Sequence, residues 1–240
     1  MINTELSNIW SCVNLPNLLS SEKELFDAHL RLRRNQPGFA DFLGWLGQGD
    51  AGIARLIGAV NRAADAIARQ GQVLVVAGMG ESWLGARAAV RMLKGAVQDG
   101  RPSVIFVGNQ IGSEEYLALF DRLEGKDFCL QLIMPDRPEP ECAIASRAVR
   151  WMMERRYGKE AKARIFVTAL PDSPMATMAK EEGYTFLAMP TEPGGGVSAL
   201  TAATLLPLTV AGIDPLAFLE GAAGAYGDYD LRAFENPVWM

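Results

Sequence analysis

The stretch Gln72–Ala89, QVLVVAGMGESWLGARAA, decides the fold of this chain. It starts with an apolar, β-branched run, Val73–Ala77, of the kind that fills a strand buried on both faces. A glycine turn at Gly78–Gly80 follows, and Ser82 stands where an N-cap would start a helix. From Trp83 onward the apolar spacing is helical. A strand, a glycine turn and a helix amino terminus together form a common anion site, usually for a phosphate.

Two well-known forms of this anion site are excluded by the sequence. The turn lacks the Gly-Lys-Ser/Thr ending of a P-loop, and Trp83 occupies the position of the third glycine in the dinucleotide fingerprint. The stretch on its own therefore predicts an α/β protein with two open alternatives. Either the turn holds an anion, or its glycines serve the turn alone.

The composition of the 240-residue chain is that of a globular protein with a sizeable core. Hydrophobic residues make up 49% of it, and the formal net charge of -5 gives no reason to expect a nucleic acid or a membrane surface as a partner. No apolar run is long enough to span a bilayer, and no basic-then-apolar leader opens the chain. We therefore expect a cytoplasmic protein.

Metal and thiol chemistry have little support in the sequence. Cys12, Cys129 and Cys142 are widely spaced and are expected to be reduced thiols, because a metal site needs a clustered Cys/His set. His29 is the one histidine, and it is expected at the surface rather than in a catalytic role. The sequence predicts no cofactor and no bound metal.

Apolar runs alternate with helical segments along the chain, at intervals of about 30 residues. This alternation predicts an α/β fold in which a doubly wound, five-stranded parallel sheet is flanked by helices. The expected strands are 72–77, 103–108, 128–133, 164–168 and 185–189.

Proline and polar residues set the expected loops and helix starts. Met134–Glu141 (MPDRPEPE) is expected to be a loop, because its three prolines cannot sit in a central strand or a helix interior. Ser198 is expected to cap a long apolar helix that runs to Val210. Asp214 followed by Pro215 is expected to open the last helix.

Several motifs of the chain occur in the same order in one known family. They are GMGESWLGARAA from Gly78, VGNQI from Val107, YGKEAKARIFVT from Tyr157 and LTAATLLPLTVAGID from Leu200. With these motifs the sequence resembles the N-terminal sugar-isomerase (SIS) half of bacterial glucose-6-phosphate isomerase, over nearly the whole chain. The resemblance implies a flavodoxin-like three-layer sandwich. It also implies a helical N-terminal extension at 1–50, a SIS domain at 51–225 and a C-terminal tail at 226–240, where the second half of the family would begin.

The resemblance implies a sugar-phosphate site from which this sequence departs. The family's glycine turn reads GIGGS; here Gly80 and Ser82 stand, but Glu81 replaces the glycine between them. The family's GGRFS is GGGVS here, so Gly196 stands at the arginine position and Ser198 at the serine. The candidate sugar-phosphate-binding residues are therefore Gly80, Ser82, Glu141 and Ser198, and no residue is assigned a catalytic role.

The family's phosphate loop, SKSGTTTE, aligns without gaps with the segment 134–141. Only Glu141 matches, and every hydroxyl and the lysine are replaced, at Met134, Pro135, Asp136, Arg137, Pro138, Glu139 and Pro140. Hydroxyls and N–H groups hold a phosphate because they donate hydrogen bonds, whereas carboxylates accept them and repel the anion. Proline has no N–H to donate. The segment is therefore expected to be a solvated loop, with a site for a cation or a basic peptide as the alternative.

Two functions follow from the resemblance. The first is a catalytically degenerate SIS domain of the glucose-6-phosphate isomerase family, with a small phosphosugar as its candidate ligand. The second is a glucose-6-phosphate isomerase, which interconverts glucose 6-phosphate and fructose 6-phosphate in glycolysis and gluconeogenesis. In that case a partner chain would supply the glutamate, histidine and lysine that the family's second half carries. The altered phosphate loop favours the first function.

The end of the sequence also suggests an association. The chain stops where the second half of the family would begin, so Trp83, Trp239 and the helix 198–210 are expected to face solvent. A homodimer or a partner chain is expected to cover this apolar surface.

Overall fold

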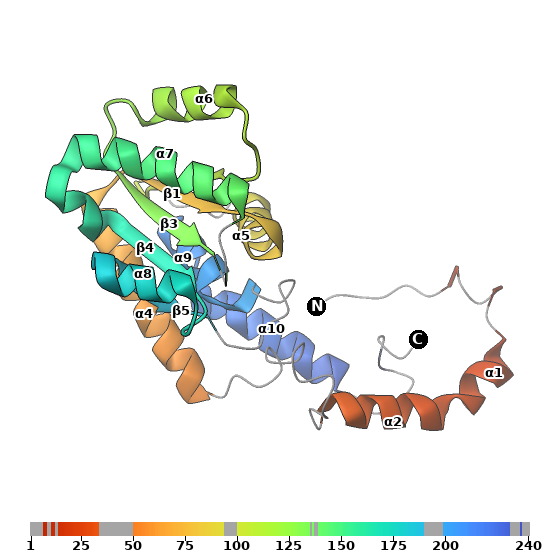
Figure 1. Cartoon of the computed structure of the whole chain (residues 1–240). Coiled ribbons are helices and arrows are strands. Elements are labelled where there is room, and N and C mark those ends of the chain that lie inside the picture. Colours follow the sequence, from red (N-terminus) through yellow and green to blue (C-terminus); the bar gives the residue numbers. More distant parts are fainter. Residues whose placement is uncertain are drawn as a thin grey trace.

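Five strands form one parallel sheet in the computed structural model of the chain, which describes residues 7–8, 11–12, 14–33, 50–93, 100–134, 136, 139–189, 199–230 and 236. The strands are β1 (Val73–Gly78), β2 (Ser103–Val107), β3 (Phe128–Ile133), β4 (Ile165–Ala169) and β5 (Thr185–Ala188). Their order across the sheet is β2-β1-β3-β4-β5 (Figure 1). Each predicted strand is confirmed to within one residue, and the doubly wound α/β fold is confirmed with it.

Helices cover both faces of the sheet, which gives the molecule three layers (Figure 1). On one face pack α4 (Asp50–Gln70), α5 (Gly80–Met92), α9 (Ala202–Val210) and α10 (Pro215–Tyr229). On the other pack α6 (Ser113–Leu123), α7 (Pro140–Tyr157), the 3-10 helix η3 (Gly158–Arg164) and α8 (Pro174–Glu182). Every residue of β1, β3 and β4 is buried. This two-sided burial explains why these strands are continuous apolar runs rather than alternating ones.

The order of the strands reverses between β1 and β3. From β1 the chain passes through α5 to β2 on one side, and from β3 it passes through α7 to β4 on the other. In open α/β sheets, ligands bind outside the carboxyl ends of the strands at such a reversal. Gly78 pairs with Ile133 at this point, so the turn after β1 and the loop after β3 begin side by side.

Two glycines allow the strand ends to approach at this edge. A Cβ on Gly108, whose φ is +107°, would lie 2.7 Å from the carbonyl oxygen of Gly78. A Cβ on Gly78 would in turn lie 3.0 Å from the carbonyl oxygen of Ile133. The distance at Gly108 is shorter than real Cβ atoms show and the distance at Gly78 is at that limit, so both glycines serve the close packing of the sheet edge.

A cluster of polar side chains connects neighbouring segments at the opposite edge of the sheet, where the amino ends of the strands lie. The Tyr157 hydroxyl accepts a hydrogen bond from the N–H of Phe128 at 3.0 Å and donates to Asp127 Oδ1 at 3.1 Å. The Arg164 guanidinium lies 4.1 Å from the centre of the Tyr157 ring and donates to the carbonyl oxygen of Gln70. We call these five residues the amino-edge clasp. It joins the end of α4, the start of β3 and the turn after α7.

Two helices begin at positions that the sequence analysis placed wrongly. α7 starts at Pro140, so Pro140 and Glu141 belong to a helix and not to the preceding loop. Proline is tolerated there because the first helical N–H has no partner within the helix. α9 starts at Ala202, and its cap is Thr201, whose hydroxyl oxygen accepts from the N–H of Ala203 at 3.3 Å. Ser198, the expected cap, lies outside the described residues.

The start of α5 also differs from the expectation. Its N-cap is Met79, which makes no side-chain cap, and Ser82 lies inside the first turn of the helix. Gly80, at φ +73°, bends the chain into the helix one turn earlier than a serine cap would. By contrast, the expected start of α10 is confirmed, because the Asp214 carboxylate accepts from the N–H of Leu216 at 2.9 Å.

The apolar surface expected to face solvent is instead buried. Trp83 is 0% exposed, and its indole N–H donates to the carbonyl oxygen of Val76 at 3.2 Å. α9 lies against the sheet with nearly every side chain buried. The expectation was wrong because α4, α5, α9 and α10 complete a core on this face within the chain itself. Trp239 lies outside the described residues.

The N-terminal helices lie apart from the sheet. α1 (Leu15–Ser20) and α2 (Glu22–Arg33) are found beyond the end of α10 (Figure 1). His29 on α2 is 9% exposed, and its Nε2 lies 3.2 Å from Asp230 Oδ1, so it is not the surface residue that was expected. The predicted boundaries at residues 50 and 225 stay predictions. No helix in the described part of the chain is long and apolar enough to cross a bilayer.

The contact between Gly108 and Gly78 gives a first testable prediction. Gly108→Ala should lower the free energy of unfolding by about 2 kcal/mol or more, because it adds a clash with backbone to the cost of a positive φ. Gly125→Ala is the matched control, since Gly125 has a φ of +71° and no atom within 4 Å of its Cβ position. It should lose only about 1 kcal/mol. Urea titrations of both variants measure the difference, and equal losses would contradict the proposed clash.

Candidate functional site

The candidate site is the carboxyl edge of the sheet between β1 and β3. α5 begins there directly after the turn at Gly78–Gly80, and no side chain caps its first N–H groups. Uncapped N–H groups at a helix start attract anions, because they are donors at the positive end of the helix dipole. α7 begins at the same edge with Glu139 at its N-cap, also without a side-chain cap, and with Pro140 as its first helical residue.

Carboxylates surround these two helix starts. Glu81 lies in the first turn of α5 and Glu141 in the first turn of α7. Glu81, Asp136 and Glu139 are exposed, and Glu141 is half-buried. Acidic side chains near a helix start stabilise the helix through its dipole. They also place negative charge where an anion would otherwise bind.

Met134, the first residue after β3, belongs to the core. It is 3% exposed, and its N–H donates to the carbonyl oxygen of Thr168 at 3.1 Å, which continues the pairing of β3 with β4 by one residue. Its side chain packs in the core on the α7 face. At this position the resemblance implies a serine hydroxyl, and the chain has an apolar side chain that is withdrawn from the edge.

Two titratable side chains near the start of α7 have shifted pKa values. Burial raises the pKa of Cys142 to about 12, and the Glu139 carboxylate adds to the rise. Burial also raises the pKa of Tyr116, helped by the Glu115 carboxylate, and the Tyr116 hydroxyl donates to the carbonyl oxygen of Gln110 at 3.0 Å. Both groups are therefore neutral near pH 7, and neither is suited to act as a base or a nucleophile.

The structure brings together some of the predicted site residues. Six of them lie at or beside the edge between β1 and β3: Gly80, Glu81, Met134, Glu139, Pro140 and Glu141. Ser82 lies in the first turn of α5, but its side chain is outside the description. Pro135, Arg137, Pro138, Gly196 and Ser198 lie outside the described residues. Within the described ranges no group of three His, Cys, Asp or Glu residues could hold a metal ion.

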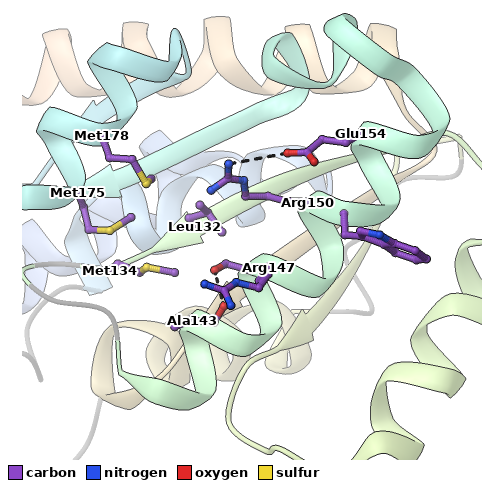
Figure 2. A pocket seen from close by; sticks show the side chains of 10 residues that line it. Leu132, Met134, Ala143, Arg147, Arg150, Glu154, Met175 and Met178 are labelled. Atoms are coloured by element: carbon purple, nitrogen blue, oxygen red, sulfur yellow. Dashed lines mark hydrogen bonds and ion pairs between the residues drawn. The ribbon is translucent and has the colours of Figure 1, made fainter.

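Next to this edge lies a groove that the sequence analysis missed. It has a volume of about 450 Å³ and runs between α7 and α8, with the end of β3 as its floor (Figure 2). We call it the α7–α8 groove. Arg147, Arg150, Trp151 and Glu154 line it from α7, and Met175 and Met178 from α8. The helical spacing of these α7 residues was a usable signal, but charged residues on a helix usually indicate only a solvated face.

The chain is similar in sequence to known proteins. No protein-family model matches the chain. A glucose-6-phosphate isomerase of Staphylococcus saprophyticus is 37% identical over 229 residues, which cover 92% of this chain and 51% of that protein. A glucose-6-phosphate isomerase of Bacillus cytotoxicus is 37% identical over 210 residues, 83% of this chain and 47% of that protein.

This chain is a partial homologue of glucose-6-phosphate isomerase. It spans about half the length of the curated relatives that it matches. The isomerase-like fold recurs in solved structures. A hypothetical protein of Thermus thermophilus has a TM-score of 0.80 at 25% identity, with 93% of this chain and 52% of that one covered. A glucose-6-phosphate isomerase of Chlamydia trachomatis has a TM-score of 0.71 at 19% identity, with 93% and 48% covered.

The buried thiols of the isomerase homologue give a second prediction. Burial raises the pKa of both Cys129 and Cys142 to about 12, whereas Cys12 is exposed. Since only the thiolate reacts, the folded chain at pH 8 should release one equivalent of thionitrobenzoate from Ellman's reagent, and three after unfolding in guanidinium. In Cys12→Ser the folded chain should release none. Rapid reaction of a second thiol in the folded chain would contradict the burial of Cys129 or of Cys142.

Proposed function

We propose that this isomerase-like SIS domain has lost the isomerase reaction and does not hold a phosphosugar at its sheet edge. The observation that carries the proposal is the segment from the end of β3 to the start of α7. It begins beside the glycine turn, at the reversal of strand order, where ligands of open α/β sheets bind. A phosphate there needs donors, and this segment offers carboxylates and a proline.

Each described position of the segment supports the proposal in its own way. Met134 contributes its side chain to the core, and Pro140 has no N–H at the first position of α7. Asp136 and Glu139 are exposed carboxylates. A phosphate dianion approaching the start of α5 would also meet Glu81 in its first turn. Holding two like charges about 4 Å apart costs on the order of 1 kcal/mol of free energy even in water, and more where water is excluded.

An active glucose-6-phosphate isomerase completed by a partner chain is the competing function. The 37% identity to two proteins of that name supports it. We propose a cytoplasmic location for the chain under either function. The two differ in whether the carboxyl edge of this chain binds a hexose phosphate. Binding to the chain alone therefore separates them, whatever a partner contributes to catalysis.

The third prediction concerns activity and binding. The purified chain should not convert fructose 6-phosphate to glucose 6-phosphate above background in an assay coupled to glucose-6-phosphate dehydrogenase. Calorimetric titration with 6-phosphogluconate, the open-chain phosphate of a six-carbon sugar acid, should give no heat of binding at millimolar ligand. Turnover, or binding in the micromolar range, would overturn the proposal.

A pair of variants tests the stated cause. Asp136→Ser with Glu139→Thr restores two hydroxyls of the family's loop and removes two carboxylates. We expect it to raise the affinity for 6-phosphogluconate by roughly tenfold or more over the unchanged chain. The matched control, Asp172→Ser with Glu160→Thr, removes two exposed carboxylates elsewhere on the surface and should leave the affinity unchanged. An equal gain in the control would show that net charge alone is responsible.

We also propose that the chain associates with a second copy or with a partner chain. Two exposed apolar side chains of α5 support this proposal, since Leu84 is 53% and Met92 84% exposed. Both side chains lie outside the core that buries Trp83 of the same helix. As a fourth prediction, light scattering at tens of micromolar should give a mass above the 26.0 kDa of one chain. A mass of one chain for the pure protein would contradict a homodimer.

A further inference from the structure

The α7–α8 groove has an apolar floor and flexible walls. Leu132 and Met134, at the end of β3, are 1% and 3% exposed and form the floor. Met175 and Met178 line the α8 side, so three methionines face the same space (Figure 2). Unbranched thioether side chains adapt their shape to a binding partner, which is why they recur on surfaces that bind peptides.

Positive charge lies along the α7 wall of the groove. Arg147 and Arg150 extend from α7 towards the methionines (Figure 2). Arg147 has no ion-pair partner within the part of the chain that the structure describes. Arg150 lies over the ring of Tyr184 at 5.5 Å, and its contact with Glu154 is long, at 3.9 Å. Its Nε is buried and has no hydrogen-bond partner among the described residues.

The outer rim of the groove combines an aromatic ring with a further cation. Trp151 lines the groove and is 52% exposed, although tryptophan is usually well buried. The Arg155 guanidinium lies 4.8 Å from the centre of the Trp151 ring. Arginine and tryptophan are the residue types that most often contribute strongly to protein interfaces. This local positive charge contrasts with the formal net charge of -5 of the whole chain.

These features select the chemistry of the occupant. A free sugar phosphate fits poorly, because the floor is apolar and Ser146, the one hydroxyl among the lining residues, already donates to the carbonyl oxygen of Ala143 at 2.9 Å. Sites for small ligands usually enclose most of the ligand surface. Here the α7 wall is open to solvent, with Glu154 62% exposed. A groove of this kind between two helices is suited to an amphipathic helix.

We propose that the α7–α8 groove binds an acidic amphipathic helix of a partner protein. The apolar stripe of that helix packs on Met178 and on the exposed ring of Trp151, above the buried Met134 and Met175, and its flanking carboxylates pair with Arg147 and Arg150. Arg150 is reached through the exposed part of its guanidinium, since its side chain is 29% exposed and its Nε is buried. This interaction goes beyond the proposed function, because it uses the α7 and α8 side chains and not the helix starts at the sheet edge.

The test starts from a selection that assumes no sequence. Random 16-residue peptides displayed on phage are selected against the full chain and then synthesised. We expect the enriched peptides to carry apolar residues at spacings of three and four with acidic residues beside them, and to gain helical circular dichroism on binding. Enrichment of basic peptides, or of sequences without this spacing, would overturn the proposal.

Charge-reversal variants tie the binding to the groove. Arg147→Glu should weaken an enriched peptide by about tenfold or more in fluorescence anisotropy, the loss expected for a charge-assisted contact. Arg147 is exposed, so the variant should keep its thermal midpoint. The matched control is Arg62→Glu, an exposed position within α4 on the other face of the sheet, which should change the affinity less than twofold.

A charge swap and a mass measurement complete the test. A peptide whose glutamates are changed to lysines should recover affinity for Arg147→Glu and lose it for the unchanged chain. Equal affinity of the acidic peptide for the unchanged chain and for Arg147→Glu would place the binding elsewhere and overturn the proposal. If Arg147→Glu instead lowers the mass in light scattering and no peptide binds, the occupant is a second copy of this chain, and the proposal is again overturned.

Discussion

The parallel pairing of β1 with two neighbours at once is the constraint on which the rest of the structure depends. Each residue from Val73 to Ala77 pairs with β2 on one side and with β3 on the other. Because this pairing is parallel, the chain returns between strands through crossover helices, and these helices cover both faces of the sheet. The chain leaves β1 and β3 in opposite directions as a result. The helix starts of α5 and α7 at the carboxyl edge and the close approach of Gly108 to Gly78 both follow from that geometry.

Most of this sheet could be predicted from the sequence, because the residues of each strand indicate that strand without knowledge of its neighbours. A strand buried on both faces must be apolar throughout, and Val73–Ala77 is apolar throughout. The wrong predictions concern residues whose burial depends on contacts with distant parts of the chain. Trp83 and the helix that ends at Val210 have the composition of either an exposed interface or a core. Only the packing of α4, α5, α9 and α10 together makes them core. His29 is buried and contacts Asp230, which lies 201 residues away in the chain.

The candidate site was predictable as a place, but less so as an arrangement of atoms. The reversal of strand order and the glycine turn locate it, and the replaced loop residues indicate its changed charge. The sequence could not indicate that Met134 extends β3 into the core, because that depends on a hydrogen bond to Thr168 in the next strand. The α7–α8 groove was missed for a related reason. In the sequence, the arginines of α7 indicate an exposed helix face and the methionines of α8 indicate a core face. Only the position of α8 beside α7 in the structure makes them the two sides of one groove.

The amino-edge clasp makes the two edges of the sheet unequal in local stability. At the amino edge, Tyr157, Asp127 and Arg164 hold together segments that lie far apart in the chain, through hydrogen bonds and ring stacking. At the carboxyl edge the first turns of α5 and α7 have no side-chain caps. The first amide hydrogens of those turns therefore have no side-chain acceptor, and we expect them to exchange with solvent faster than those of the clasp. The fold is therefore held from the side that faces away from the candidate site. This separation lets the residues of the site edge change without loss of the scaffold that carries them.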